Sequence, residues 1–128
     1  MAGELILIVE DNEKNLKLAK DVLQFRGYRT LEADNARDAI ALAISQLPDL
    51  ILMDIQLPDM DGVEALNRLK AEPATAGIHV VALTALAMPR DRERLLGAGF
   101  AGYLSKPIDV KQFGEQVRSY CELAGPEG

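Results

Sequence analysis

The stretch Leu50-Ile51-Leu52-Met53-Asp54 places four consecutive apolar residues directly before a carboxylate. A short continuous apolar run is typical of a strand that is covered on both faces, as the strands of a parallel sheet are. Continuous apolar runs also occupy residues 5–9 and 80–83, and less regular apolar stretches occupy residues 28–33 and 103–104. The sequence therefore predicts five strands, of which residues 50–53 form the third.

Amphipathic stretches separate these runs. The apolar residues that recur in them at helical spacing are Leu16, Ala19, Val22 and Leu23, then Ala36, Ala39, Ile40, Ala43 and Ile44, then Val63, Leu66 and Leu69, then Leu95 and Leu96, and finally Val110, Phe113, Val117 and Tyr120. Gly27 is placed to end the first helix, whereas Asn35 and Asp109 are placed to cap the second and the last. Five successive strand–helix units predict a three-layer α/β domain, in which helices cover both faces of one parallel sheet.

The composition is that of an acidic globular chain. Its 128 residues suffice for one domain over residues 1–128, with a core of about 5–123. Fourteen Lys and Arg against 20 Asp and Glu give a net charge of −6, which argues against binding to nucleic acid or to an anionic membrane. No apolar run is long enough to span a bilayer or to act as a signal peptide, so we expect a cytoplasmic protein. The single cysteine, Cys121, excludes an internal disulfide.

Residues that suit one binding site follow four of the five predicted strands. They are Glu10 and Asp11 after the first strand, Asp54 after the third, Thr84 and Ala85 after the fourth, and Ser105, Lys106 and Pro107 after the fifth. Because the carboxyl ends of parallel strands lie at one edge of the sheet, we expect these residues to converge there. Taken singly, the acidic pair could be solvated loop residues, Thr84 a strand residue and Lys106 a surface lysine. Their joint occurrence favours a single site.

Clustered carboxylates repel one another, so a site built from them needs a cation. Oxygen ligands without histidine or cysteine favour Mg²⁺, for which Mn²⁺ can substitute. A threonine hydroxyl and a lysine ammonium suit phosphoryl oxygens, and a carboxylate can attack phosphorus to form an acyl phosphate. These residue types therefore predict Mg²⁺-assisted phosphoryl transfer onto an aspartate.

Other cofactor sites are not indicated. The sequence contains neither a glycine-rich dinucleotide motif nor a phosphate-binding loop that ends in Gly-Lys-Ser/Thr. The acidic residues after the first strand would repel the phosphate of a flavin. His79, the only histidine, precedes the fourth predicted strand and is interpreted as structural.

Four segments carry motifs in a fixed order along the chain. They are residues 8–12 (IVEDN), 48–62 (PDLILMDIQLPDMDG), 81–85 (VALTA) and 99–107 (GFAGYLSKP). Together they resemble the receiver domain of two-component response regulators, most closely stand-alone receivers of the DivK type and receiver modules of hybrid histidine kinases. The resemblance spans nearly the whole chain and implies a doubly wound (βα)5 fold of the flavodoxin type, with a five-stranded parallel sheet.

The resemblance implies which residues accept the phosphoryl group and hold the metal. Asp54 corresponds to the phosphoacceptor. Asp11, Asp54 and the backbone carbonyl of Gln56 correspond to the Mg²⁺ ligands, and Glu10 to an acidic residue that acts on the ion through water. Gln56 and Leu86 correspond to the two positions that tune the lifetime of the phosphoryl group, Leu86 by shielding it from water.

The resemblance also implies residues that contact the phosphoryl group and transmit the signal. Thr84, Ala85 and Lys106 correspond to the phosphoryl contacts. Thr84 and Tyr103 correspond to a switch pair that moves together on phosphorylation. The bond between Lys106 and Pro107 corresponds to a cis peptide that aims the lysine inward.

The partners implied are a histidine kinase or a histidine phosphotransferase as donor, and a downstream protein effector. The effector would bind the face made by the fourth helix, fifth strand and fifth helix, residues 88–120, on a monomer or weak dimer. Such a domain is not an enzyme, although it assists its own phosphorylation and dephosphorylation. The alternative from another class is a Mg²⁺-dependent phosphatase of the haloacid dehalogenase kind. That kind requires Asp-x-Asp after the first strand, where residues 11–13 read Asp-Asn-Glu, and a cap for which 128 residues leave no room.

Overall fold

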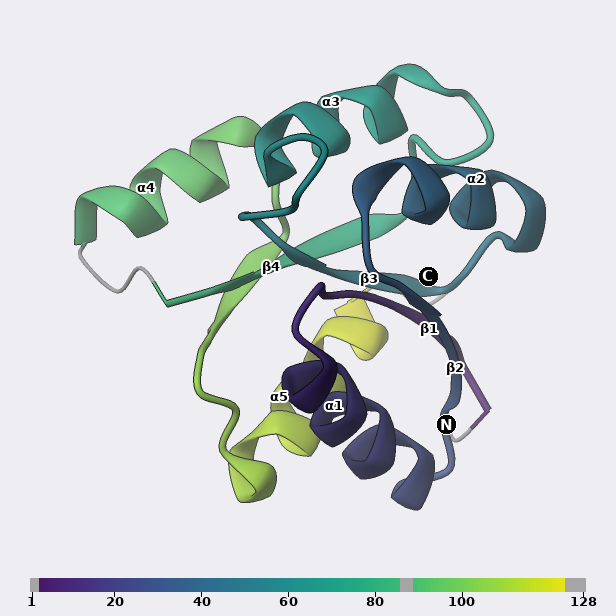
Figure 1. Ribbon diagram of the computed structural model, residues 1–128, viewed down its shortest axis with the longest axis vertical. Coiled ribbons are helices and arrows are strands. Elements are labelled where there is room, and N and C mark those ends of the chain that lie inside the picture. The colour runs from purple at the N-terminus through teal and green to yellow at the C-terminus, as the bar shows by residue number, and fades with distance from the viewer. Residues whose placement is uncertain (1–2, 86–88, 124–128) are drawn as a thin grey trace.

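A computed structural model shows strands alternating with helices in the residues that it describes, 3–85 and 89–123 (Figure 1). The elements are β1 (Leu5–Val9), α1 (Glu13–Phe25), β2 (Arg29–Ala33), α2 (Ala36–Gln46), β3 (Leu50–Asp54), α3 (Gly62–Ala71), β4 (His79–Thr84), α4 (Pro89–Ala98), β5 (Gly102–Ser105) and α5 (Val110–Leu123). This order confirms the predicted alternation. Within these residues, no helix combines the length and the apolar character needed to span a bilayer.

The strands form one parallel sheet in the order β2-β1-β3-β4-β5. Helices α2, α3 and α4 lie on one face and α1 and α5 on the other, so the sheet is the middle of three layers (Figure 1). The winding reverses between β1 and β3, because β2 lies on one side of β1 and the later strands lie on the other. The doubly wound fold is confirmed, and ligands of such folds bind at the carboxyl edge near this reversal.

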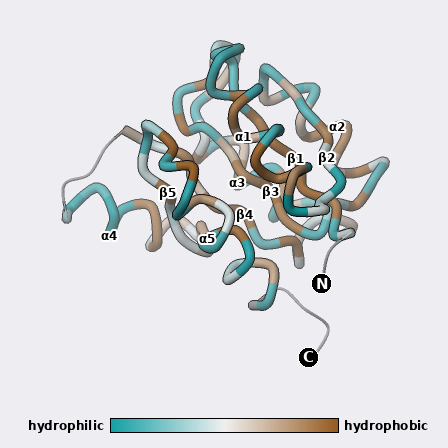
Figure 2. Tube along the Cα trace, turned by 90° about the horizontal axis from the view of Figure 1, so that it is seen from below, coloured by the Kyte–Doolittle hydropathy of each residue, from teal (hydrophilic) through white to brown (hydrophobic). Residues whose placement is uncertain are grey.

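Two hydrophobic clusters hold the layers together, one on each face of the sheet. Successive residues of β1 point to opposite faces. Leu7 and Val9 join the cluster that includes residues of α2 and α3, whereas Ile6 and Ile8 join the cluster that includes residues of α1 and α5. Figure 2 shows β1 and β3 as hydrophobic, brown segments at the centre of the trace. Coverage on both faces explains why these strands have continuous apolar sequences.

Side-chain caps set the beginnings of several helices. The side chains of Asn35 and Asp109 accept hydrogen bonds from N–H groups in the first turns of α2 and α5, which confirms both predicted caps. Asn12 and Asp61 cap α1 and α3 in the same way, and these two caps were not expected. Each such cap stabilises a helix by about 1 kcal/mol. Gly27 has a φ of 93° just beyond α1, a left-handed conformation that suits a glycine at a helix end.

Several strand boundaries differ from the predicted ones by one residue. The second strand begins at Arg29, one residue later than predicted, and β5 is longer by one residue at each end. The third and fourth strands end on Asp54 and Thr84, one residue further than predicted, because backbone pairing with the neighbouring strand continues past the last apolar side chain. His79, predicted to precede the fourth strand, is its first residue, at the edge opposite Asp54.

Candidate functional site

Three side chains from distant segments meet at the carboxyl edge of the sheet. Glu10 follows β1, Asp54 ends β3, and Lys106 follows β5. The ammonium nitrogen Nζ of Lys106 lies 2.8 Å from Oε1 of Glu10 and 2.9 Å from Oδ2 of Asp54. Both carboxylates are buried, and the lysine side chain is 17% exposed. The structure thus brings three of the predicted site residues into direct contact.

Backbone hydrogen bonds orient the two carboxylates. Oδ1 of Asp54 accepts a hydrogen bond from the N–H of Gln56 at 2.9 Å. Oε2 of Glu10 accepts one from the N–H of Asn12 at 3.1 Å. Each carboxylate therefore uses one oxygen to hold the loop that follows it and presents the other oxygen to the ammonium of Lys106.

Burial and mutual contact govern the protonation of this group. Removal from water raises the pKa of Glu10; the hydrogen bonds from Lys106 and Asn12 oppose this shift without cancelling it, and the negative charge of Asp54 adds to it. Burial lowers the pKa of Lys106, but its two carboxylate partners outweigh burial and raise the pKa above the ordinary 10.5. The lysine is therefore charged at neutral pH. Its stabilising contribution is fully present below pH 10.5 and is lost as the pH rises through its raised pKa.

Carboxylates outnumber the ammonium at this edge. Glu10, Asp11 and Asp54 each place a carboxylate oxygen within 4.8 Å of those of the other two. Oε1 of Glu10 is buried and, among the described residues, makes the ion pair with Lys106 and no further hydrogen bond. Asp11 is exposed, so the cluster is open to solvent on its side. Three hard oxygen donors with an excess of negative charge fit a divalent cation such as Mg²⁺.

The threonine and lysine segments lie side by side because β4 and β5 are neighbours. Thr84 is buried as the last residue of β4, and its carbonyl accepts the N–H of Lys106 at 2.9 Å. Ala85 follows it and is exposed. The peptide bond between Lys106 and Pro107 is cis. Leu86, the residue expected to shield a phosphoryl group, lies outside the described residues.

Tyr103 lies back from the acidic edge, on the outermost strand β5. Its side chain is half-buried, and the guanidinium carbon of Arg92 in α4 lies 5.5 Å from the centre of its ring. A guanidinium over an aromatic face is attracted to it by about 0.5–1 kcal/mol at an exposed site. The sequence does not indicate this contact, because a mostly polar helix does not show which strand its long side chains cover.

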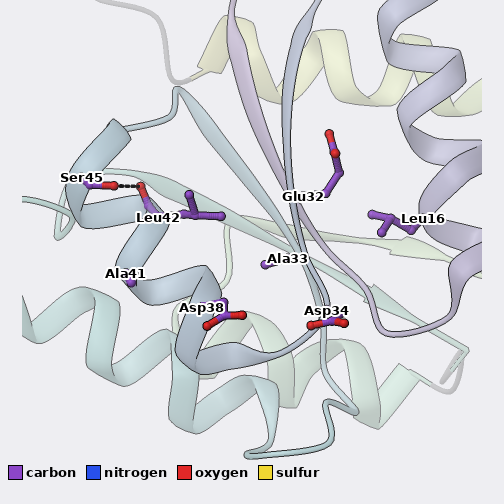
Figure 3. A pocket seen from close by; sticks show the side chains of 8 residues that line it. All are labelled: Leu16, Glu32, Ala33, Asp34, Asp38, Ala41, Leu42 and Ser45. Atoms are coloured by element: carbon purple, nitrogen blue, oxygen red, sulfur yellow. Dashed lines mark hydrogen bonds between the residues drawn. The ribbon is translucent and has the colours of Figure 1, made fainter.

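A separate hollow of about 710 Å³ lies along β2, the outermost strand on that side of the sheet. Figure 3 shows it between α1, which supplies Leu16, and α2, which supplies Leu42 and Asp38. The residues that line it are Leu16, Glu32, Ala33, Asp34, Asp38, Ala41, Leu42 and Ser45. None of them belongs to the cluster at Asp54, and none is basic. This hollow therefore lacks the cation that a phosphoryl site needs, and the candidate site is the cluster.

Comparison with known proteins agrees with this geometry. Residues 6–118 match the model of the response regulator receiver domain. The chain is 46% identical over 115 residues to the polar-differentiation response regulator DivK of Brucella anthropi. The aligned region covers 90% of this chain and 94% of that protein. The receiver domain of a sensor histidine kinase from Pseudomonas aeruginosa, solved with a magnesium ion coordinated in its active site cleft, is 35% identical with a TM-score of 0.85, over 94% of this chain and 99% of that one. A CheY-like receiver domain protein from Methanospirillum hungatei is 31% identical with a TM-score of 0.86, over 99% of this chain and all (100%) of that one.

Fold and site together define a class of signalling domain, in which a doubly wound sheet presents an acidic cluster and a lysine at its carboxyl edge. The chain belongs to the response regulator receiver domain family. Within that family it is similar to DivK, so the resemblance carried by the four motifs is confirmed. Domains of this family interact with histidine kinases and effectors, and the phosphatase alternative is not favoured.

Proposed function

We propose that this chain is a phosphoacceptor of two-component signal transduction, in which Asp54 receives a phosphoryl group from a phosphohistidine. The observation that carries the proposal is the ammonium of Lys106 between Asp54 and Glu10, at 2.9 and 2.8 Å. It places a cation beside one oxygen of a buried carboxylate. Such a cation can move its contact from the carboxylate to an incoming phosphoryl oxygen over a short distance.

We assign Mg²⁺ binding to Asp11, Asp54 and the backbone carbonyl of Gln56, with Glu10 acting through water. All of these donors are oxygen atoms, and their negative charge exceeds the single positive charge of Lys106. When bound, the ion neutralises charge on the carboxylate and on the phosphoryl oxygens. The magnesium ion in the Pseudomonas aeruginosa receiver supports this assignment.

In the proposed reaction, a carboxylate oxygen of Asp54 attacks phosphorus while the bond to the donor histidine nitrogen breaks, and that nitrogen keeps the electron pair. Lys106, the hydroxyl of Thr84 and the N–H of Ala85 are assigned to the three phosphoryl oxygens. Water later attacks the phosphorus and releases the carboxylate. The domain therefore assists both its phosphorylation and its dephosphorylation, and it processes no separate substrate.

Replacing Asp11 tests the metal assignment. Asp11→Ala removes one of three mutually repelling carboxylates, so the metal-free variant should melt at a higher temperature than the metal-free wild type. Mg²⁺ at 10 to 100 times its Kd should stabilise the wild type by about 1–3 kcal/mol, and the variant by much less. The measurement is thermal unfolding with and without Mg²⁺. Asp34→Ala, which removes an exposed carboxylate outside the cluster, should keep the wild-type shift; a full Mg²⁺ shift in Asp11→Ala would remove Asp11 from the ligand set.

An exposed apolar surface lies between α1 and α5. Phe25 is 93% exposed and Val110 is 54% exposed, and together with Leu18 and Val22 they line a hollow of about 420 Å³. Exposed aromatic residues in a contiguous patch mark interaction surfaces. Val110 is the first residue of α5, which begins just after the Lys106 loop, whereas Phe25 is the last residue of α1, at the end of that helix away from the site. We assign this patch to the histidine-bearing donor, which would contact the start of α5 while its histidine reaches Asp54.

Phe25→Asp should slow phosphoryl transfer from a histidine phosphotransferase by about tenfold or more, because a charge replaces a central apolar contact. Transfer from acetyl phosphate, which needs no protein docking, should be unchanged. Phe25→Leu keeps an apolar side chain and should retain most of the rate. Initial rates of phosphorylation with the two donors check this; equal rates for wild type and Phe25→Asp with the protein donor would show that it docks elsewhere.

We assign signal output to the face made by α4, β5 and α5. Thr84 is buried at the end of β4, and Tyr103 is half-buried on the adjacent strand beneath Arg92. Movement of the Thr84 hydroxyl toward a phosphoryl oxygen would free space for the tyrosine ring to rotate inward. Such a rotation breaks the contact with Arg92 and changes the surface that a partner meets, which makes it a two-state element that phosphorylation biases.

Amide chemical shifts with and without beryllofluoride and Mg²⁺ test the output face. We expect beryllofluoride to change the amide chemical shifts from the loops around Asp54 across residues 89–120. In Tyr103→Ala, we expect fewer residues of that face to change. Ser119→Ala, at an exposed position of α5, serves as the control and should leave the extent of the shift changes as in the wild type. Shifts confined to the loops of the site would show that this face does not respond to the acceptor.

A further inference from the structure

The loop between β3 and α3 carries Gln56, whose carbonyl is assigned to the metal. Local contacts hold the inner part of this loop. The N–H of Gln56 donates to Oδ1 of Asp54 at 2.9 Å, and Gln56 forms an isolated antiparallel bridge with Asp61. The N–H of Gly62 donates to the carbonyl of Ile55, also at 2.9 Å. These contacts close the loop on itself, but they do not fix where its tip lies relative to the rest of the molecule.

Asp59 holds the tip to another element. Its Oδ1 accepts the N–H of Ala36 at 2.8 Å, and its Oδ2 accepts the N–H of Arg37 at 2.9 Å. These are the first two amides of α2, while Asn35 takes the third, that of Asp38. Among the residues that the structure describes, these are the only hydrogen bonds between residues 57–60 and a different helix or strand.

The physical chemistry of this contact makes it a firm one. A carboxylate that uses both oxygens on adjacent amides has one orientation, and each bond is charge-assisted. The amino end of an 11-residue helix also carries a partial positive charge that favours an anion. The amides of Ala36 and Arg37 correspondingly hold the pKa of Asp59 below its ordinary value. Leu57 and Met60 are partly buried and pack against the hydrophobic cluster on this face of the sheet, whereas Pro58 and Asp59 are open to solvent. The carboxylate of Asp59 therefore adds directional bonds to this packing.

We propose that Asp59 is a positioning residue for the metal site: by anchoring the loop to the amino end of α2, it keeps the backbone at Gln56 in the conformation that lies beside Asp54. The inference rests on the proposed metal-binding function. It assigns to α2, which contributes no side chain to the acidic cluster, an influence on metal affinity. Replacing a residue that orients a metal ligand without touching the metal commonly changes metal affinity by about 10–100-fold.

The test compares Mg²⁺ titrations of the wild type, Asp59→Ala and Asp59→Asn, followed by amide chemical shifts. Asp59→Ala should weaken Mg²⁺ binding by about tenfold, the lower end of the range for such residues. Asp59→Asn keeps one acceptor oxygen, so its affinity for Mg²⁺ should lie between that of the wild type and that of Asp59→Ala. In the metal-free proteins, the amide of Gln56 should shift in Asp59→Ala, and the amides of Ala36 and Arg37 should exchange faster with solvent.

Two controls separate positioning from charge and from stability. Asp34→Asn removes an exposed negative charge near the start of α2 but no bond to the loop. Asp49→Ala removes a carboxylate that accepts the N–H of Leu5 at 2.7 Å, which costs a similar hydrogen bond far from the site. The inference would be overturned if Asp59→Ala bound Mg²⁺ as tightly as these controls and the amide chemical shift of Gln56 did not change. Failure of the wild type to bind Mg²⁺ would instead contradict the proposed function, and the metal-free shift of Gln56 would still decide whether Asp59 positions the loop.

Discussion

Asp54→Asn is expected to abolish phosphoryl incorporation from acetyl phosphate in the presence of Mg²⁺. The amide keeps the shape of the carboxyl and an oxygen that can accept the N–H of Gln56, so the fold should persist. It lacks the second carboxylate oxygen that would act as the nucleophile and hold the ammonium of Lys106. Intact-mass spectrometry after incubation with acetyl phosphate measures the loss.

The matched control for this experiment is Asp61→Asn. Asp61 is an exposed carboxylate of the same loop that caps α3, and it makes no contact with Lys106. This variant should be phosphorylated to nearly the wild-type extent and should lose little stability, because asparagine caps a helix about as well as aspartate does. Undiminished phosphate on Asp54→Asn would show that another side chain is the acceptor.

Lys106→Ala should cause the largest loss of stability among the single substitutions at the site. It leaves Glu10 and Asp54 buried and close to each other without a cation. Removal of one partner from a buried ion pair typically costs about 3–5 kcal/mol. Mg²⁺ should restore part of this loss, because it supplies positive charge to the same carboxylates. Urea unfolding of the metal-free and the Mg²⁺-loaded protein measures both effects.

Lys17→Ala provides the comparison. Lys17 also forms an ion pair at 2.8 Å, with Asp21, but the two side chains are 73% and 52% exposed. An exposed pair of this kind contributes about 0–1 kcal/mol. The two lysines thus have ion pairs of similar length in different surroundings. If metal-free Lys106→Ala had the same free energy of unfolding as Lys17→Ala, the buried cluster would not depend on the lysine for its stability.

The sequence carries enough information to predict the sheet and the convergence of the acidic cluster. Strands such as Ile6–Val9 within β1 are buried on both faces, and only continuous apolar runs satisfy that condition. Once the strands are parallel, their carboxyl ends must share an edge, so Glu10, Asp54 and Lys106 meet there whatever the details of the helices. That step needs topology alone.

Contacts that depend on how a loop or helix lies across the sheet could not be predicted. Asp59 and the amides of α2 belong to segments far apart in the chain, and no periodicity relates them. The contact between Arg92 and Tyr103 depends on the position of α4 over β5. The caps Asn12 and Asp61, in contrast, had a usable signal, because each is a short polar residue immediately before an amphipathic stretch.

Localisation of the phosphoryl group on the wild-type chain tests the central claim most directly. The chain would be incubated with acetyl phosphate, once with Mg²⁺ and once with a chelator, then digested and sequenced by tandem mass spectrometry under conditions that preserve acyl phosphates. We expect one phosphoryl group on the peptide that contains Asp54, present with Mg²⁺ and nearly absent with the chelator. A phosphoryl group on a different residue, or equal incorporation without the metal, would contradict it.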